Sequence, residues 1–271
     1  RQIGEKTLVT MKLLTKYQNR LVPTIGAILL FGKNRTFHFS DAWIQCGRFS
    51  GTDKTEIFDT VEINDSLPVA VESAMLFLKK HAIRSADLSK GIHRKDVWNI
   101  PVGILREVIV NAAVHCDYSQ RGAPIRVSFF DDRIEVENPG ILLPGMTIED
   151  MLDGVSKIRN PVIARVFREI GLIEQWGSGV RRVFNEARAL GLPLLSINEI
   201  GMRIRFIIPL LKSVAVTGSG VLKGPVEEGA QSVAQSVAQS VAQSKAILSA
   251  LAERPLSASE LARVLGLQIK T

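Results

Sequence analysis

The fold is decided by residues 101–140, PVGILREVIVNAAVHCDYSQRGAPIRVSFFDDRIEVENPG. Their first part carries apolar residues at helical spacing behind a proline, which predicts a helix over residues 101–115. Residues 123–140 read as two strands joined by a turn at Asp131 and Asp132. A helix followed by a hairpin, without a regular β-α-β repeat, predicts an α/β fold with two layers and a mixed sheet.

Capping residues and glycines mark further helices on both sides of this segment. Thr147 forms a capping box with an acid three residues on, and Asn160 and Gly171 are expected as the cap and the stop of another helix. Apolar residues from 25 to 32 fit either a buried strand or a helical turn. The other expected elements are helices at 5–17, 68–81, 147–152, 160–171 and 178–191, and strands at 42–49, 56–63 and within 194–210.

Composition and charge are those of an ordinary globular chain. Of the 271 residues, 46% are hydrophobic and 23% are charged, which suffices for a sizeable core. No apolar run approaches the roughly 18–20 residues of a membrane span, so we expect no membrane contact and a cytoplasmic location. Cys46 and Cys116 lack metal-ligand spacing, which favours two buried free thiols. The net charge of +7 suits a polyanionic partner, and also an ordinary solvated surface.

Glu107 and Asn111 are the first candidate site residues. A spacing of four places both on one face of the helix at 101–115, and the rest of that helix is strongly apolar. A carboxylate and an amide in such surroundings need partners. The structural alternative is that Glu107 pairs with a neighbour such as Arg106 while Asn111 bonds a loop carbonyl. The pair alone does not decide between a site and this structural role.

Glycines at the ends of predicted elements are the second signal. Gly140 follows the hairpin, and Gly177, Ser178 and Gly179 run directly into a helix. Glycines at a helix start let backbone N–H groups approach a phosphate, and the helix N-terminus favours its negative charge. An ordinary loop entry with Ser178 as the N-cap is the alternative.

Lys157 and Arg159 lie between these glycines, in a segment placed to form a lid. They are candidate phosphate contacts, and exposed lid charges are the alternative. The order of the signals matters more than any one of them: a helix with ExxxN, a strand with a glycine turn, a long segment, and GxG opening a helix.

At these residues the chain resembles a known family. Residues 106–140 and 159–182 closely resemble the divergent ATP-binding domain of bacterial and archaeal transcriptional regulators, many of them labelled ATP-dependent DNA helicase RecG-related proteins. That domain is similar to the ATPase superfamily of gyrase, histidine kinases and MutL. The resemblance implies a Bergerat-type fold that holds ATP with Mg²⁺. It also implies a winged helix after the domain and a Schlafen-like AlbA domain before it, which this sequence lacks.

The resemblance also implies roles for individual residues. Asn111 matches the Mg²⁺-binding Asn of the superfamily, and Glu107 matches the Glu that polarises the attacking water. Gly140 matches a glycine of the first glycine box. Gly177 and Gly179 match the second box, at the phosphates.

Asn138 departs from the superfamily pattern. It stands where an Asp usually accepts a hydrogen bond from the adenine amino group. An Asn carbonyl also accepts such a bond, but without charge. Adenine preference and hydrolysis therefore stay open.

We expect four parts in the chain. They are an α+β connector subdomain (1–90), an ATP-binding domain (91–210), a low-complexity linker with QSVA repeats (211–244) and a partial winged helix or helix-turn-helix (245–271). In the last part, ELARVLG follows a short turn in the way a helix-turn-helix opens, with a generic helical hairpin as the alternative.

The leading hypothesis is a transcriptional regulator that binds Mg·ATP and contacts DNA through its C-terminal helices. One alternative is a slow ATPase or a helicase-related DNA-processing protein. A P-loop motor is not expected, because the sequence holds no GxxxxGK[ST] segment. Another alternative is a non-catalytic dimerisation scaffold, and whether the chain forms a homodimer is open.

Overall fold

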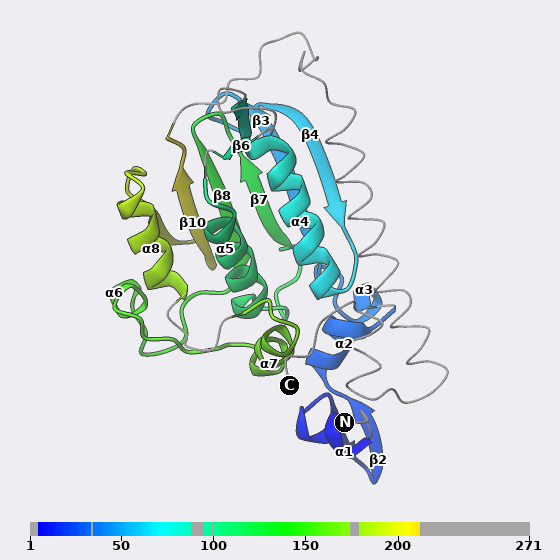
Figure 1. Cartoon of the computed structure of the whole chain (residues 1–271). Coiled ribbons are helices and arrows are strands. Elements are labelled where there is room, and N and C mark those ends of the chain that lie inside the picture. Colours follow the sequence, from blue (N-terminus) through cyan, green and yellow to red (C-terminus); the bar gives the residue numbers. More distant parts are fainter. Residues whose placement is uncertain (1–4, 34, 88–94, 99, 174–178, 212–271) are drawn as a thin grey trace. The chain divides into compact units, whose positions relative to one another are not determined.

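The computed structural model describes residues 5–33, 35–87, 95–98, 100–173 and 179–211. Its contacts divide the chain into two units: residues 31–220, and a smaller unit that includes residues 1–30. The helices, labelled in Figure 1 where there is room, are α1 Glu5–Thr10, α2 Ile25–Phe31, α3 Arg35–His38, α4 Leu67–Ala82, α5 Val102–His115, α6 Ile148–Leu152, α7 Pro161–Glu169 and α8 Gly179–Ala189. The strands are β1 Leu14–Tyr17, β2 Arg20–Pro23, β3 Ile44–Ser50, β4 Glu56–Ile63, β5 Ile83–Asp87, β6 Lys95–Trp98, β7 Ile125–Phe129, β8 Arg133–Pro139, β9 Ser196–Ile200 and β10 Arg203–Pro209.

The smaller unit contains a correction to the expected helix at 5–17. Helix α1 ends at Thr10, and the chain continues into the antiparallel hairpin of β1 and β2. Lys12 has a φ of 57°, and the amides of Lys12 and Leu13 bond back to the carbonyls of Val9 and Leu8. This is the Schellman arrangement that ends a helix, with a lysine where glycine is usual. The apolar spacing in the sequence therefore predicted a helix that was too long, because no glycine marks the position where α1 ends.

A six-stranded mixed sheet forms the centre of the larger unit. Its strand order is β4-β3-β7-β8-β10-β9, and β3 pairs with β7 in parallel while the other neighbours are antiparallel. This confirms the expected α/β fold with a mixed sheet. The sheet takes strands from both sides of residue 90, because β3 and β4 join the four strands that follow α5. Of residues 25–32, which fitted a strand or a helical turn, residues 25–31 form helix α2.

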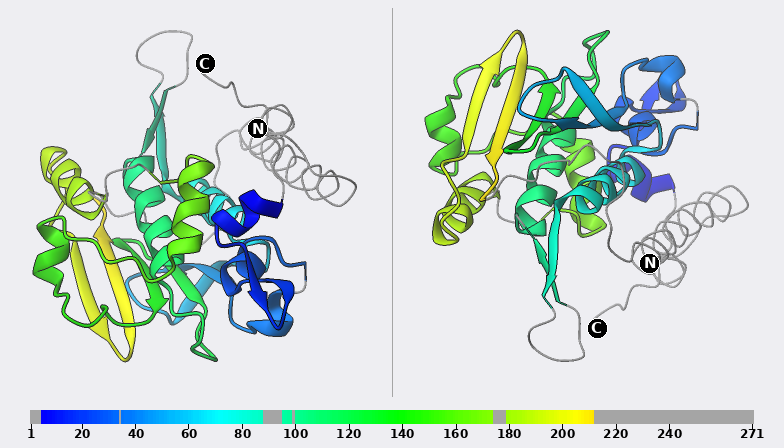
Figure 2. Two further views of the ribbon diagram at one scale, coloured as in Figure 1. Left: turned by 90° about the horizontal axis from the view of Figure 1, so that it is seen from below. Right: turned by 90° about the horizontal axis from the view of Figure 1, so that it is seen from above.

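The core lies between this sheet and its helices. Helices α4 and α5 pack against each other and against the strands β3, β4, β7 and β8, and both lie in front of the sheet in Figure 1. Figure 2 shows α4, α5 and α7 on the same side of the sheet. Eight apolar residues of α5 are buried, which is why that helix is apolar almost all round. The sheet contributes Ile44, Cys46, Ile125, Val127, Phe129, Ile134, Val136, Phe206 and Ile208.

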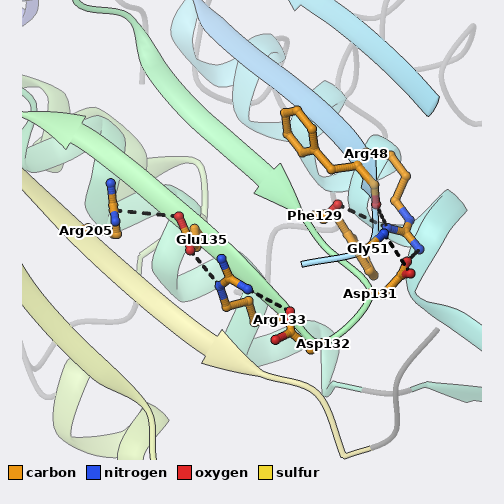
Figure 3. Close-up of polar contacts among 9 residues, drawn as sticks. Arg48, Gly51, Phe129, Asp131, Asp132, Arg133, Glu135 and Arg205 are labelled. Carbon is orange, nitrogen blue, oxygen red and sulfur yellow. Dashed lines mark hydrogen bonds and ion pairs between the residues drawn. The ribbon is translucent and has the colours of Figure 1, made fainter. Parts of the chain in front are cut away.

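Strand β8 is buried on both faces, and the two faces differ in chemistry. Ile134 and Val136 alternate with Glu135 and Glu137, whose residues are each only 4% exposed. The Nη2 atom of Arg205, on the neighbouring β10, lies 3.1 Å from Glu137 Oε1, and its Nε atom lies 3.7 Å from Glu135 Oε2. Figure 3 shows Arg205 and Arg133 on either side of Glu135. Side chains alternate along a strand. Because Glu135 and Glu137 lie on the ionic face, the next residue, Asn138, lies on the opposite face, which the helices cover.

The capping signals read from the sequence are largely confirmed. Thr147 and Asp150 form the expected capping box at α6. Gly171 ends α7 with a φ of 76°, and Gly191 ends α8 with a φ of 68°. These left-handed conformations suit glycine, which lacks a Cβ.

Asn160 stands at the expected N-cap position of α7, and its carbonyl accepts from the amide of Ala164 at 3.0 Å, but its side chain makes no capping bond to that helix. Its Nδ2 atom donates instead to the carbonyls of Val114 (2.9 Å) and Cys116 (2.7 Å). The carbonyl groups at the end of a helix have no partner within the helix. Asn160 therefore supplies a donor to the end of α5 and attaches the preceding loop to it.

Candidate functional site

The half-buried polar positions of α5 carry the first two candidate residues. The side-chain nitrogen of Asn111 donates to the backbone carbonyl of Glu107 at 2.9 Å and to its Oε1 atom at 3.0 Å. The expected spacing of one helical turn thus brings the amide and the carboxylate into direct contact. Both residues line a cavity of about 190 Å³.

Glu107 also contacts helix α8. Its side chain is 16% exposed, and its Oε2 atom lies 3.2 Å from the Nη2 atom of Arg182. The cation that approaches this carboxylate therefore comes from α8, whereas the sequence suggested the neighbouring Arg106. A Cβ atom added at Gly179 would overlap the carboxylate of Glu107. The first residue of α8 is therefore packed directly on Glu107, which requires a glycine there or a shift of the glutamate.

Asn138 lies at the end of β8, on the face that α5 covers. It is 6% exposed, lines the same cavity, and its Nδ2 atom donates to the carbonyl of Pro139 at 3.1 Å. With its nitrogen engaged in this way, the carbonyl oxygen of the amide is the atom oriented to accept a hydrogen bond. An acceptor at this position suits a ligand amino group.

Gly140 turns the chain out of β8. It has a φ of 102°, and a Cβ atom there would lie 3.0 Å from the Cβ atom of Asp117. The amide of Asp117 in turn donates to Pro139 O at 2.8 Å. Gly140 is not one of the described residues that line the cavity. The contacts that the structure describes give it another role, because its lack of a Cβ atom lets the turn pass close to the loop after α5.

The segment 141–159 forms one wall of the cavity, and both of its candidate cations are fixed to it. Lys157 Nζ donates to the carbonyl of Pro144 at 2.8 Å, and Arg159 Nη2 donates to that of Ile141 at 2.6 Å. Both residues line the cavity. Each cation thus links two parts of the segment to each other, and each also borders the cavity.

The charges around the cavity are unequal. Among the described residues of its lining, the cations are Lys157, Arg159, Arg168 and Arg182, and the acid is Glu107. The apolar part of the lining includes Val108, Ala112, Val136, Ile204 and Phe206. A cavity with an apolar wall and an excess of positive charge suits a ligand with an apolar ring and a strongly anionic end.

His115 lies at the end of α5 beside this charged group. Burial lowers its pKa from 6.5 to about 4, and the positive charge of Arg159 adds to the effect. The imidazole is therefore neutral near pH 7 and adds no further cation to the cavity.

Sequence reasoning missed two cations of the cavity, Arg168 and Arg182. The available signal for Arg182 was its position three residues after Gly179, which places both on one face of a helix. Arg168 lies on α7 and left no comparable signal. Gly177 and Ser178, the rest of the expected glycine box, lie outside the described residues, as do residues 212–271 with the linker and the C-terminal helices.

Comparison with known proteins supports an ATPase-like domain in part of the chain. Residues 122–208 match the family described as "Putative ATP-dependent DNA helicase recG C-terminal". The match covers about a third of the chain, from the approach to β7 to the end of β10, and α5 precedes it. None of the curated proteins matches the chain.

The fold also resembles a solved structure. It is similar to the crystal structure of the DIP2311 protein from Corynebacterium diphtheriae, with a TM-score of 0.59 and 23% sequence identity over 78% of this chain. The aligned part is 35% of that protein, so this chain spans about a third of its length. At this identity the similarity shows the fold alone. In the part of the chain that the structure describes, no helix is long and apolar enough to cross a membrane.

Proposed function

We propose that the unit beginning at residue 31 binds a nucleoside triphosphate together with Mg²⁺. The observation that carries this proposal is the shared cavity of Glu107, Asn111 and Gly179, with Lys157 and Arg159 at its wall. These groups come from two helices and a loop far apart in the sequence. Their combination of one amide oxygen, one carboxylate and several cations matches what phosphates and a hard metal ion require.

The size of the cavity fits the nucleobase of such a ligand, and the charges of its lining suit the anionic end. A cavity of about 150 Å³ accommodates a benzene ring, so about 190 Å³ with apolar walls has room for a nucleobase. Mg²⁺ usually binds proteins through one or two side chains and completes its shell with phosphates and water. Asn111 would be its protein ligand here. Together with the mixed sheet and the match at residues 122–208, this supports a fold of the Bergerat type.

The base would be selected by Asn138. Its nitrogen is engaged by the carbonyl of Pro139, so its oxygen would accept from an amino group such as that of adenine. Guanine presents a carbonyl oxygen at the same ring position, and two acceptors repel. We therefore propose ATP rather than GTP as the ligand.

Slow hydrolysis of ATP is a second candidate function, and the position of Glu107 favours it. A mostly buried carboxylate beside the proposed phosphate site is placed to take a proton from water. Mg²⁺, when bound, would neutralise phosphate charge. A helicase motor is not part of this proposal.

DNA binding and regulation remain proposals that rest on the sequence. The segment 245–271, which carries the helix-turn-helix pattern, lies outside the described residues. We propose that it contacts DNA and that nucleotide binding modulates this contact. DNA affinity of the full chain, measured with and without Mg·ATP, tests the modulation, and equal affinities would remove it.

Calorimetric titration of the full chain with ATP, ADP and GTP in the presence of Mg²⁺ tests the central proposal. We expect saturable binding of one ATP per chain, weaker binding of ADP, and weaker binding of GTP than of ATP. A chain that is folded by circular dichroism and binds none of the three would contradict the proposal. It would favour the remaining alternative, in which the domain is a dimerisation scaffold.

A further inference from the structure

Helix α8 brings Arg182 to the carboxylate of Glu107. Gly179, the first residue of α8, lies so close to this carboxylate that a Cβ atom would overlap it. Arg182 follows one helical turn later, on the same face, and its Nη2 atom lies 3.2 Å from Glu107 Oε2. The residue borders the cavity, and its side chain is 41% exposed.

The contact of Arg182 differs from the side-chain hydrogen bonds of Lys157 and Arg159, the two cations of the segment 141–159. Those two donate to carbonyl oxygens of their own loop, and Arg159 Nη1 also lies 4.0 Å from Asp117 Oδ2. Arg182 lies within hydrogen-bond distance of the candidate base Glu107, and a guanidinium binds a carboxylate and a phosphate through the same pair of N–H donors. A phosphate entering the cavity would therefore compete directly with Glu107 for Arg182.

We propose that Arg182 is an exchangeable ligand, which holds Glu107 when the cavity lacks phosphate and moves to phosphate oxygens when a triphosphate binds. This inference rests on the proposed function. Arg182 contacts Glu107 Oε2, an oxygen that would accept from the attacking water. Its transfer to phosphate removes the guanidinium from that oxygen, so the carboxylate can accept from water once the substrate is in place.

The reaction that this exchange permits is a balanced hydrolysis. A water oxygen bonds to the terminal phosphorus, and the bond from that phosphorus to its bridging oxygen breaks. The nucleoside diphosphate leaves with the electron pair, and Glu107 takes the proton of the water. Arg182 is in this scheme a positioning residue for Glu107 and a specificity determinant for phosphate.

A double-mutant cycle on the full chain tests the exchange. Affinities for ATP and for adenosine are measured by calorimetry with Mg²⁺ for wild type, Arg182→Gln, Glu107→Gln and the double variant. Arg181→Gln is the matched control, because Arg181 is the exposed neighbour on the same helix. Arg182→Lys, which keeps the charge and loses the paired donors, is the second variant at the site.

We expect Arg182→Gln to weaken ATP binding about tenfold, the usual effect of losing a charged hydrogen bond. Adenosine binding should stay within about twofold, as in the Arg181 control. Arg182→Lys should fall between wild type and Arg182→Gln. Glu107→Gln should strengthen ATP binding about threefold, because it removes the competing anion of a part-exposed ion pair. This gain should vanish in the Arg182→Gln background.

Two results would overturn the inference while leaving the nucleotide site in place. One is equal ATP affinity in Arg182→Gln and Arg181→Gln. The other is a gain from Glu107→Gln that persists without Arg182. A folded wild-type chain that binds no ATP would instead remove the proposed function, and the inference with it. Melting temperatures recorded for every variant separate these results from a loss of folding.

Discussion

The side-chain nitrogen of Asn111 bonds two oxygen atoms of Glu107, the backbone carbonyl and Oε1. Both partners are acceptors, so the nitrogen must point at them, since the amide oxygen would be repelled in its place. The Oδ1 atom of Asn111 therefore faces away from Glu107, on a residue that lines the cavity. One helical turn thus presents a carboxylate for proton transfer beside a neutral oxygen for a hard cation.

Glu107→Gln should remove hydrolysis without weakening nucleotide binding. The amide has nearly the same shape as the carboxylate but cannot take a proton from water, and loss of a general base typically costs a factor of about 10²–10⁴. Phosphate release is measured for wild type and variant, with Glu149→Gln, at an exposed position on α6, as the control. A wild-type rate that survives in Glu107→Gln would assign the base to another residue.

Gly179→Ala should destabilise the chain, whereas Gly103→Ala should not. The added methyl group at Gly179 overlaps the carboxylate of Glu107, while a Cβ atom at Gly103 meets no atom within 4 Å. We expect a loss of about 1–3 kcal/mol at Gly179 from overpacking and a gain of up to about 1 kcal/mol at Gly103 from helix propensity. Urea unfolding of both variants measures this.

The Gly179→Ala variant, made with and without Glu107→Ala, separates two views of Gly179. If the methyl group acts through Glu107, the cost of Gly179→Ala should largely disappear in a Glu107→Ala background. If Gly179 only starts a helix, the cost would be the same in both backgrounds. Selective loss of ATP over adenosine affinity in Gly179→Val would further support its place at the phosphates.

Acid should destabilise the folded chain through His115. Burial lowers the pKa of this imidazole from 6.5 to about 4, so between these values the unfolded chain binds a proton that the folded chain does not. Stability therefore falls as the pH drops from 6.5 towards 4, by about 2–3 kcal/mol at the lower end. Urea unfolding at about pH 7 and pH 4.5 measures the difference. It should shrink in His115→Gln and persist in His38→Gln, at an exposed position.

Both thiols should be unreactive in the folded chain. Cys46 and Cys116 are buried; burial raises the pKa of Cys46 to about 12 and also raises that of Cys116. Because the thiolate is the nucleophile, alkylation at about pH 8 should be slow until denaturant is added, and mass spectrometry counts the adducts. Rapid labelling of either thiol in the native chain would show that its surroundings open without global unfolding.

Local signals in the sequence predicted local structure well. The capping box of Thr147 and Asp150 and the stop at Gly171 depend on atoms within a few residues of each other, and the structure contains both. The helix end at Lys12 was missed because a non-glycine residue takes the left-handed conformation there. Asn160 was expected at a cap, and its side chain bonds α5 instead, since those carbonyls approach it only after folding.

Features that depend on distant parts of the chain could not be read in the same way. The parallel pairing of β3 with β7 joins strands about 80 residues apart. The sequence of neither strand indicates which strand it pairs with. Glu107, Asn111 and Asn138 were identified as candidates from their own segments and from the family resemblance, and the structure brings them to one cavity. Arg182 was missed because its contact with Glu107 exists only once α8 packs on α5.

The most direct test of the account is the Mg²⁺ dependence of ATP affinity in Asn111→Ala, measured by calorimetry on the full chain. Wild type should bind ATP more tightly with Mg²⁺ than without it, because the cation would use the amide oxygen of Asn111. Asn111→Ala should lose this gain and keep its affinity for adenosine, while Asn185→Ala, at an exposed position on α8, should behave as wild type. The same Mg²⁺-dependent gain in Asn111→Ala as in wild type would contradict the account and place the metal elsewhere.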